Sequence, residues 1–204
     1  SNDTIGGFNS MIEKEKKLDV DAHVTTVLFN DQYKMLYNRR ELKDVSKMTD
    51  KDYTPGGMTA LLDAVGRTIH KMDMVAGIHR KDKGNKVLFV IITDGEENDS
   101  KEYTYADVKK LIKDRQENAG WEFIFLGANI DAAAAAENLG IDRDRAVKYK
   151  NTGSGVRANF KAVAELSDSL AKSGRVSDEW KETVEKDEDD AADKQSAAVT
   201  LHRR

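Results

Sequence analysis

The chain has 204 residues, with one proline, no cysteine and a net charge of −4, since 33 Lys and Arg residues oppose 37 Asp and Glu residues. A cysteine-free chain forms no disulfide, zinc-thiolate site or cysteine nucleophile, and it fits a reducing compartment such as the cytoplasm. The mild charge argues against a nucleic-acid or membrane-surface partner, and no apolar run approaches the roughly 20 residues that span a bilayer.

The first part of the chain predicts a helix followed by a hairpin. Apolar residues recur at spacings of three and four over residues 3–17, which is the period of an amphipathic helix. Residues 24–29 and 33–37 are rich in strand-forming residues and are separated by an Asn-Asp turn, so we expect them to pair antiparallel. After a polar segment, the turn Pro55-Gly56-Gly57 leads into a helix expected from about Thr59 to residue 75.

The second part alternates strands and helices. Residues 87–92 are apolar on both faces, which is the pattern of a central parallel strand. The further elements expected are a helix at 105–117, a strand at 121–126, a short helix at 131–139, an edge strand at 146–149 and a helix at 156–172. This order predicts an α/β fold with a doubly wound, mostly parallel sheet, to which the hairpin adds one antiparallel edge strand.

Such a fold should begin with a strand, whereas the first expected element is a helix, so the first strand is expected to be absent from the chain. The domain is therefore expected to cover residues 1–174 and to be incomplete at its N-terminal end. Residues 175–204 are polar, with an acidic run and one aromatic residue, Trp180. They predict a disordered or loosely helical tail, in which Trp180 is a candidate docking residue.

Two loops carry the candidate site. In open α/β sheets, ligands bind beyond the carboxyl ends of the strands. Asp94 follows the most apolar strand and precedes Gly95 and an acidic run that begins at Glu96. This segment is either an acidic rim suited to a divalent cation or a solvated Asp-Gly turn. Thr59 follows the Gly56-Gly57 turn, where its hydroxyl either reaches a metal or an anion or belongs to an ordinary first helical turn.

These two segments resemble the von Willebrand factor A domain family. The matching text is Tyr-Thr-Pro-Gly-Gly-Met-Thr-Ala-Leu-Leu-Asp-Ala at 53–64 and Phe-Val-Ile-Ile-Thr-Asp-Gly-Glu-Glu-Asn at 89–98. The family has a glycine-led Thr-Ala-Leu before a helix and an apolar strand that ends in Thr-Asp-Gly. The element order agrees over residues 3–172, and residues 3–9 and 121–129 are similar to bacterial and phage-type members.

In that family the two segments build a metal-ion-dependent adhesion site. The resemblance implies that Thr59 supplies a hydroxyl ligand and Asp94 a carboxylate to Mg²⁺ or Mn²⁺. An acidic side chain of a protein partner then completes the octahedral oxygen shell that Mg²⁺ requires. Asp63 lies one helical turn after Thr59, where it either orients the site or is a solvated or capping residue. The residues expected to support the site are Gly57, Asp63, Gly95 and Glu96.

The chain departs from the family in one respect. The other three ligands of the family come from Asp-x-Ser-x-Ser at the end of the first strand, and the sequence enters that connection at Ser1-Asn2-Asp3. The explanations are a truncated record or a mis-assigned gene start, a strand supplied by another chain, or a metal-free variant. We therefore expect weak or absent metal binding by this polypeptide alone.

The expected function is that of a cytoplasmic protein-interaction module, not an enzyme, with a protein partner and neither a nucleic-acid nor a membrane partner. One alternative is a Mg²⁺-dependent α/β enzyme that processes phosphoesters with Asp94 and the acidic rim. No nucleophile or phosphate loop accompanies these residues in the sequence. The other alternative is a truncated remnant without a working site. The sequence does not indicate the identity of the partner or the oligomeric state.

Overall fold

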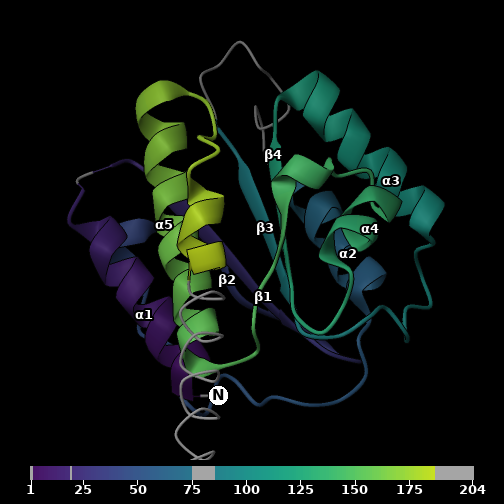
Figure 1. Cartoon of the computed structure of the whole chain (residues 1–204), viewed down its shortest axis with the longest axis horizontal. Coiled ribbons are helices and arrows are strands. Elements are labelled where there is room, and N and C mark those ends of the chain that lie inside the picture. Colours follow the sequence, from purple (N-terminus) through teal and green to yellow (C-terminus); the bar gives the residue numbers. More distant parts are fainter. Residues whose placement is uncertain (1, 19, 75–85, 187–204) are drawn as a thin grey trace, which may run out of the picture.

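A computed structural model describes residues 2–18, 20–74 and 86–186 of the chain (Figure 1). The protein is a mixed α/β protein, as the sequence predicts. Its main elements, in chain order, are α1 (Asn2–Lys16), β1 (His23–Phe29), β2 (Tyr33–Glu41), α2 (Leu61–Asp73), β3 (Leu88–Thr93), α3 (Tyr105–Asp114), β4 (Glu122–Gly127), α4 (Ala132–Asn138), β5 (Ala146–Lys148) and α5 (Gly153–Ser173).

The strands form two sheets. β1 and β2 pair antiparallel, as predicted, from Phe29 opposite Tyr33 to His23 opposite Glu41. β3, β4 and β5 form a parallel sheet in that order, with a regular register between β3 and β4. Among the described residues no strand pairing joins the hairpin to β3. The single mixed sheet with the hairpin as its antiparallel edge is therefore not observed.

Helices cover both faces of the parallel sheet. Successive side chains of a strand point to opposite faces, so Phe123 and Phe125 of β4 pack with α2 and α3, whereas Ile124 and Leu126 pack with α5. These four β4 residues are at most 1% exposed. The sequence favoured β3 as the central strand, but β4 is the buried one because it has a neighbouring strand on each side.

A third apolar cluster joins α1 to the hairpin and to the polar segment after it. Phe8 and Ile12 of α1 pack with Tyr37 of β2 and with Met48. The side chain of Asn9 donates to Met48 O and accepts from Met48 N, at 2.9 and 2.8 Å. The polar segment that precedes Pro55 is thus held in place by α1.

The beginning of the expected tail packs on the domain. Val176, Trp180 and Val184 are buried against α5 and the parallel sheet, and Trp180 is only 1% exposed. Residues 180–186 are helical, and a spacing of four places Trp180 and Val184 on one face of this helix, while Val176 precedes it. Trp180 therefore contacts its own domain. The remainder of the expected tail, residues 187–204, lies outside the described residues.

Candidate functional site

Asp94 lies at the carboxyl ends of all three parallel strands. It follows β3 directly and is exposed. The amide of Asn151, just after β5, donates to Asp94 Oδ2 at 3.2 Å. The amide of Asn129, just after β4, lies 3.5 Å from Asp94 O. Neither asparagine was predicted from the sequence to belong to the site, although each is a polar amide that follows shortly after a strand.

Thr59 is held against the loop that carries Asp94. Its N–H donates to Asn98 Oδ1 at 2.7 Å, and its carbonyl accepts from Asn98 N at 3.0 Å. A Cβ atom at Gly95 would lie 3.2 Å from Thr59 Oγ1, so the hydroxyl borders the residue next to Asp94. The structure thus brings the two predicted segments together. Thr59 lies before α2, which begins at Leu61, and not in its first turn as predicted.

Gly56 and Gly57 place the loop before Thr59 against the turn of the hairpin. Both have positive φ angles, +117° and +97°, which glycine adopts without strain. Asn30 Nδ2 donates to Gly56 O at 2.9 Å. A Cβ atom at Gly57 would lie 2.8 Å from Asp31 Oδ1, so a side chain at this position would displace the Asp31 carboxylate.

Glu97 caps α2 from across the site. Its Oε2 accepts from Leu62 N at 2.9 Å, and its Oε1 accepts from Ser100 N at 2.8 Å. Ser100 Oγ also donates to Oε2, at 2.8 Å. A carboxylate is favourable at a helix N-terminus because it satisfies free N–H groups and the helix dipole. Glu97 therefore ties its loop to α2 and is not part of an open acidic rim.

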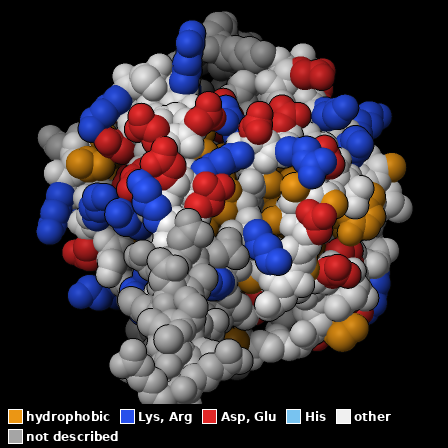
Figure 2. All heavy atoms as spheres, viewed as in Figure 1, with side chains coloured by type: hydrophobic (Ala, Val, Ile, Leu, Met, Phe, Trp, Pro, Cys, Tyr) orange, Lys and Arg blue, Asp and Glu red, His pale blue; other side chains and the backbone are white. Residues whose placement is uncertain are grey.

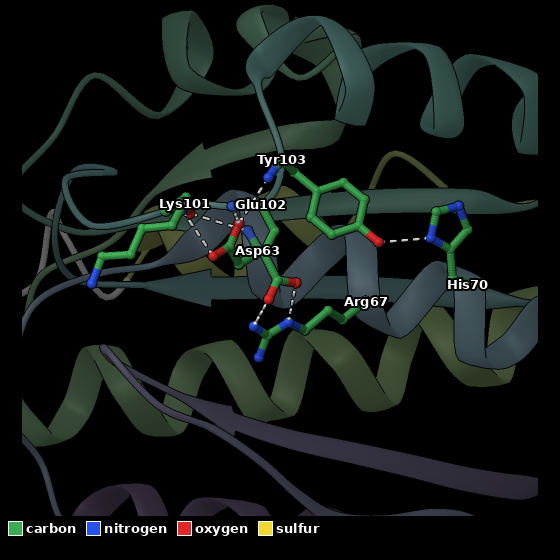
Figure 3. Close-up of polar contacts among 7 residues, drawn as sticks. Asp63, Arg67, His70, Lys101, Glu102 and Tyr103 are labelled. Carbon is green, nitrogen blue, oxygen red and sulfur yellow. Dashed lines mark hydrogen bonds and ion pairs between the residues drawn. The ribbon is translucent and has the colours of Figure 1, made fainter.

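Asp63 ties the following residues to the same helix (Figure 3). Its side chain is 7% exposed. Oδ1 accepts from the backbone N–H groups of Glu102 and Tyr103, and Oδ2 accepts from that of Lys101, at 2.9–3.0 Å. Burial alone would raise the pKa of Asp63, but these three donors outweigh it and hold the pKa below the ordinary value of 3.8. Asp63 is thus a buried positioning residue, not a solvated one.

Two outer contacts complete this network (Figure 3). Arg67 forms a two-point ion pair with Glu102, with Nε 2.8 Å from Oε2. Tyr103 lies against α2 at Gly66, where a Cβ atom would meet the tyrosine ring at 2.5 Å, and its hydroxyl lies 2.7 Å from His70 Nδ1. Because the ion pair is exposed, its contribution is small. The buried Asp63 contacts carry more of the loop's stability.

The described residues offer few metal ligands. Glu96 is exposed and lines a shallow depression with Asn129, Asp131 and Lys148. No group of three His, Cys, Asp or Glu side chains in the described part of the chain is placed to hold a metal ion. Thr59 and Asp94 offer two oxygen ligands from neighbouring loops. Because Mg²⁺ often keeps several waters and uses one or two carboxylates, this set fits a weakly held, hydrated ion.

No protein-family model matches the chain, and comparison with curated proteins finds no significant match. Within residues 2–18, 20–74 and 86–186, no helix has the length and apolar character needed to cross a membrane. The fold and the loops define an α/β protein with a polar site at the carboxyl end of a parallel sheet.

Proposed function

We propose that the chain is a cytoplasmic protein-interaction module of the von Willebrand factor A type, and that it binds its partner at the carboxyl ends of β3, β4 and β5. The observation that carries this proposal is the pairing of the Thr59 and Asp94 loops. Asn98 and Glu97 hold the two loops together, while the Asp94 carboxylate remains exposed. A fixed frame around one exposed carboxylate is suited to recognition of a partner group.

The finer fold assignment belongs to the same proposal. A doubly wound sheet requires helices on both faces and loops that converge beyond the strand ends. The clusters on the two faces of β4 and the convergence of residues 94, 129 and 151 support it.

Binding is favoured over catalysis by the groups around Asp94. Its described hydrogen-bond partners are the amides of Asn129 and Asn151, which are neither nucleophiles nor general bases at neutral pH. His70 contacts Tyr103 and is occupied elsewhere. Figure 2 shows acidic and basic side chains interspersed over the face in view. Such a surface supports a protein partner more than a nucleic acid, which calls for a basic patch.

A divalent cation fits this proposal as a weak ligand. Mg²⁺, when bound, would supply an electrophilic centre that an acidic side chain of the partner completes. Thr59 would offer its hydroxyl, and Asp94 its carboxylate, whose Oδ2 is already oriented by Asn151. Asp63 and Glu97 would hold the surrounding loops and would not be metal ligands, because their oxygens accept hydrogen bonds from backbone N–H groups.

The proposed binding of a divalent cation is tested by nuclear magnetic resonance with Mn²⁺ as the probe. Millimolar Mn²⁺ is expected to broaden the amide signals of Gly95 and Asn98 first. The effect should disappear in Asp94→Ala and persist in Asp50→Asn, a control at an exposed carboxylate. Equal broadening in Asp94→Ala, or micromolar affinity in the unmodified chain, would contradict the proposed weak site.

The proposed binding of a protein partner is tested with the tagged chain as bait in an extract of the source cells. We expect a partner that the unmodified chain and Asp50→Asn both retain, and that Asp94→Ala or chelation with EDTA releases. A partner retained equally by all three would place its binding surface elsewhere. Turnover of p-nitrophenyl phosphate that is lost in Asp94→Ala would instead support the phosphoester enzyme.

A further inference from the structure

The loop after β5 brings a side-chain amide to the exposed carboxylate of Asp94. Asn151 Nδ2 donates to Asp94 Oδ2 at 3.2 Å, and both residues are exposed. The amide of Asn129, in contrast, lies 3.5 Å from the backbone oxygen of Asp94 and not against its carboxylate. Asn151 is therefore the neighbour that meets the group proposed to bind a cation.

The backbone on either side of Asn151 is held in place. Tyr149 is buried, and its N–H donates to Gly127 O at 3.0 Å, which continues the pairing of β4 with β5 by one residue. Thr152 caps α5, because its Oγ1 accepts from Gly155 N at 3.2 Å. Asn151 thus projects from a fixed turn between β5 and α5, and its exposed amide can rotate without a movement of the main chain.

The amide of Asn151 carries a donor and an acceptor on the same carbon atom. Rotation by about 180° around the last side-chain bond exchanges its NH₂ group and its oxygen with little change of position. Without a cation the NH₂ group faces Asp94, since two oxygens at this separation would repel each other. Beside a cation the preference is reversed, because the amide oxygen is attracted and the NH₂ group is repelled.

The separation of the two side chains suits adjacent ligands of one cation. In an octahedral shell with ligands at roughly 2.1 Å, neighbouring oxygens are about 3.0 Å apart. Asn151 Nδ2 and Asp94 Oδ2 are 3.2 Å apart, so the rotated amide would place its oxygen close to that spacing. Carbonyl oxygens are suitable ligands for Mg²⁺ and Mn²⁺. A neutral amide also leaves the positive charge of the ion available to an acidic group of the partner.

We propose that Asn151 is a further oxygen ligand of the cation site at Asp94, and that its amide rotates by half a turn when the cation binds. Its NH₂ group orients the carboxylate before binding, and its oxygen joins Asp94 and the Thr59 hydroxyl afterwards. The inference rests on the proposed function, since it concerns a cation at the same site. Loss of the hydrogen bond between Asn151 and Asp94 accompanies binding, which keeps the affinity weak.

The side-chain NH₂ signals of Asn151 in nuclear magnetic resonance test the rotation. Mg²⁺ is diamagnetic, so these signals stay visible throughout a titration. They are expected to shift with the same midpoint as the backbone amide of Gly95, whereas those of Asn38, an exposed asparagine on β2, are not. A shift at Gly95 without one at Asn151 would overturn this inference and leave the proposed function standing. No shift at either residue would overturn both.

Three variants separate a ligand from a residue that only orients Asp94. The Mn²⁺ concentration that half-broadens Gly95 is expected to rise about tenfold in Asn151→Ala. It should fall about tenfold in Asn151→Asp, whose carboxylate binds a cation but donates nothing to Asp94. Asn129→Asp is the matched control, because it adds the same charge at the backbone oxygen of Asp94, and its effect should be smaller. Unchanged or tighter binding in Asn151→Ala, weaker binding in Asn151→Asp, or an equal gain in Asn129→Asp would refute the assignment.

Discussion

Replacement of Asp63 by alanine tests how the site is held together. The carboxylate accepts three backbone N–H groups, from Lys101, Glu102 and Tyr103. A net contribution of about 1 kcal/mol for each hydrogen bond predicts a loss of about 3 kcal/mol in the free energy of unfolding. Asp63→Asn should lose about half as much, since Oδ1 can still accept from Glu102 and Tyr103, while the new amide opposes the N–H of Lys101.

Urea denaturation at several pH values measures these losses. The folded-state pKa of Asp63 lies below its ordinary value of 3.8, so its ionised form stabilises the protein above pH 3.8. That stabilisation declines as the pH falls through the lower, folded-state pKa. The difference between the unmodified chain and Asp63→Asn should therefore be full at pH 7 and shrink below about pH 3.8.

The matched control is Asp168→Asn. Asp168 lies on the surface of α5 and pairs with Lys172 at 2.7 Å, and exposed pairs of this kind contribute about 0–1 kcal/mol. Asp63→Ala must lower the free energy of unfolding by more than this control if the reasoning is to stand, and its effect must decline at acid pH. Otherwise Asp63 does not hold residues 101–103 in place through its hydrogen bonds.

Two further predictions concern buried groups outside the site. Glu15 lies between α1 and α5 with Ser167 Oγ donating to it at 2.9 Å, and burial raises its pKa. The ionised form thus destabilises the fold as the pH rises from 4.5 through the raised pKa. Glu15→Gln should gain about 1 kcal/mol at pH 7 and nothing at pH 4 in urea denaturation; a loss at pH 7 would contradict this. Trp180→Ala should cost about 3–5 kcal/mol in the same assay because this side chain is buried, and a cost under about 1 kcal/mol would contradict its packing on the domain.

Local patterns predicted the order of helices and strands, but not the pairing of strands. The hairpin follows from two strands separated by a short turn, which leaves them little other choice. Residues 88–92 read as a central strand because both faces are apolar, yet that pattern does not reveal which strands lie on each side. Residues 176–186 were predicted to be the start of a disordered or loosely helical tail, whereas Trp180 and its apolar neighbours are buried on the domain. The few apolar residues of this segment recur every four positions, and their burial depends on a surface contributed by α5 and the parallel sheet.

The residues of the candidate site that belong to a sequence motif could be predicted. The residues whose role depends on contacts with distant parts of the chain could not. Asp94 stands out in the sequence because it lies between an expected strand and Gly95, and Thr59 because it follows the Gly56-Gly57 turn at the start of an expected helix. Composition does not distinguish Asp94 from Glu97, although one is exposed and the other caps a helix. The difference arises because Glu97 also accepts from the N–H of Leu62, which is 35 residues away in the chain. The first residue of α2 was likewise mispredicted, since its cap comes from another loop.

The capping of α2 also distinguishes the two functional hypotheses. A helix N-terminus attracts phosphate because its first N–H groups are free and its dipole is uncompensated. In this protein Leu62 N donates to Glu97 and Asp63 N donates to Ser100 Oγ, at 2.9 and 3.0 Å. The carboxylate of Glu97 adds a negative charge at that helix end, so an incoming phosphate would be repelled. An exposed carboxylate beside an occupied helix N-terminus favours a cation or a hydrogen-bond donor, which supports the interaction module over the phosphoester enzyme.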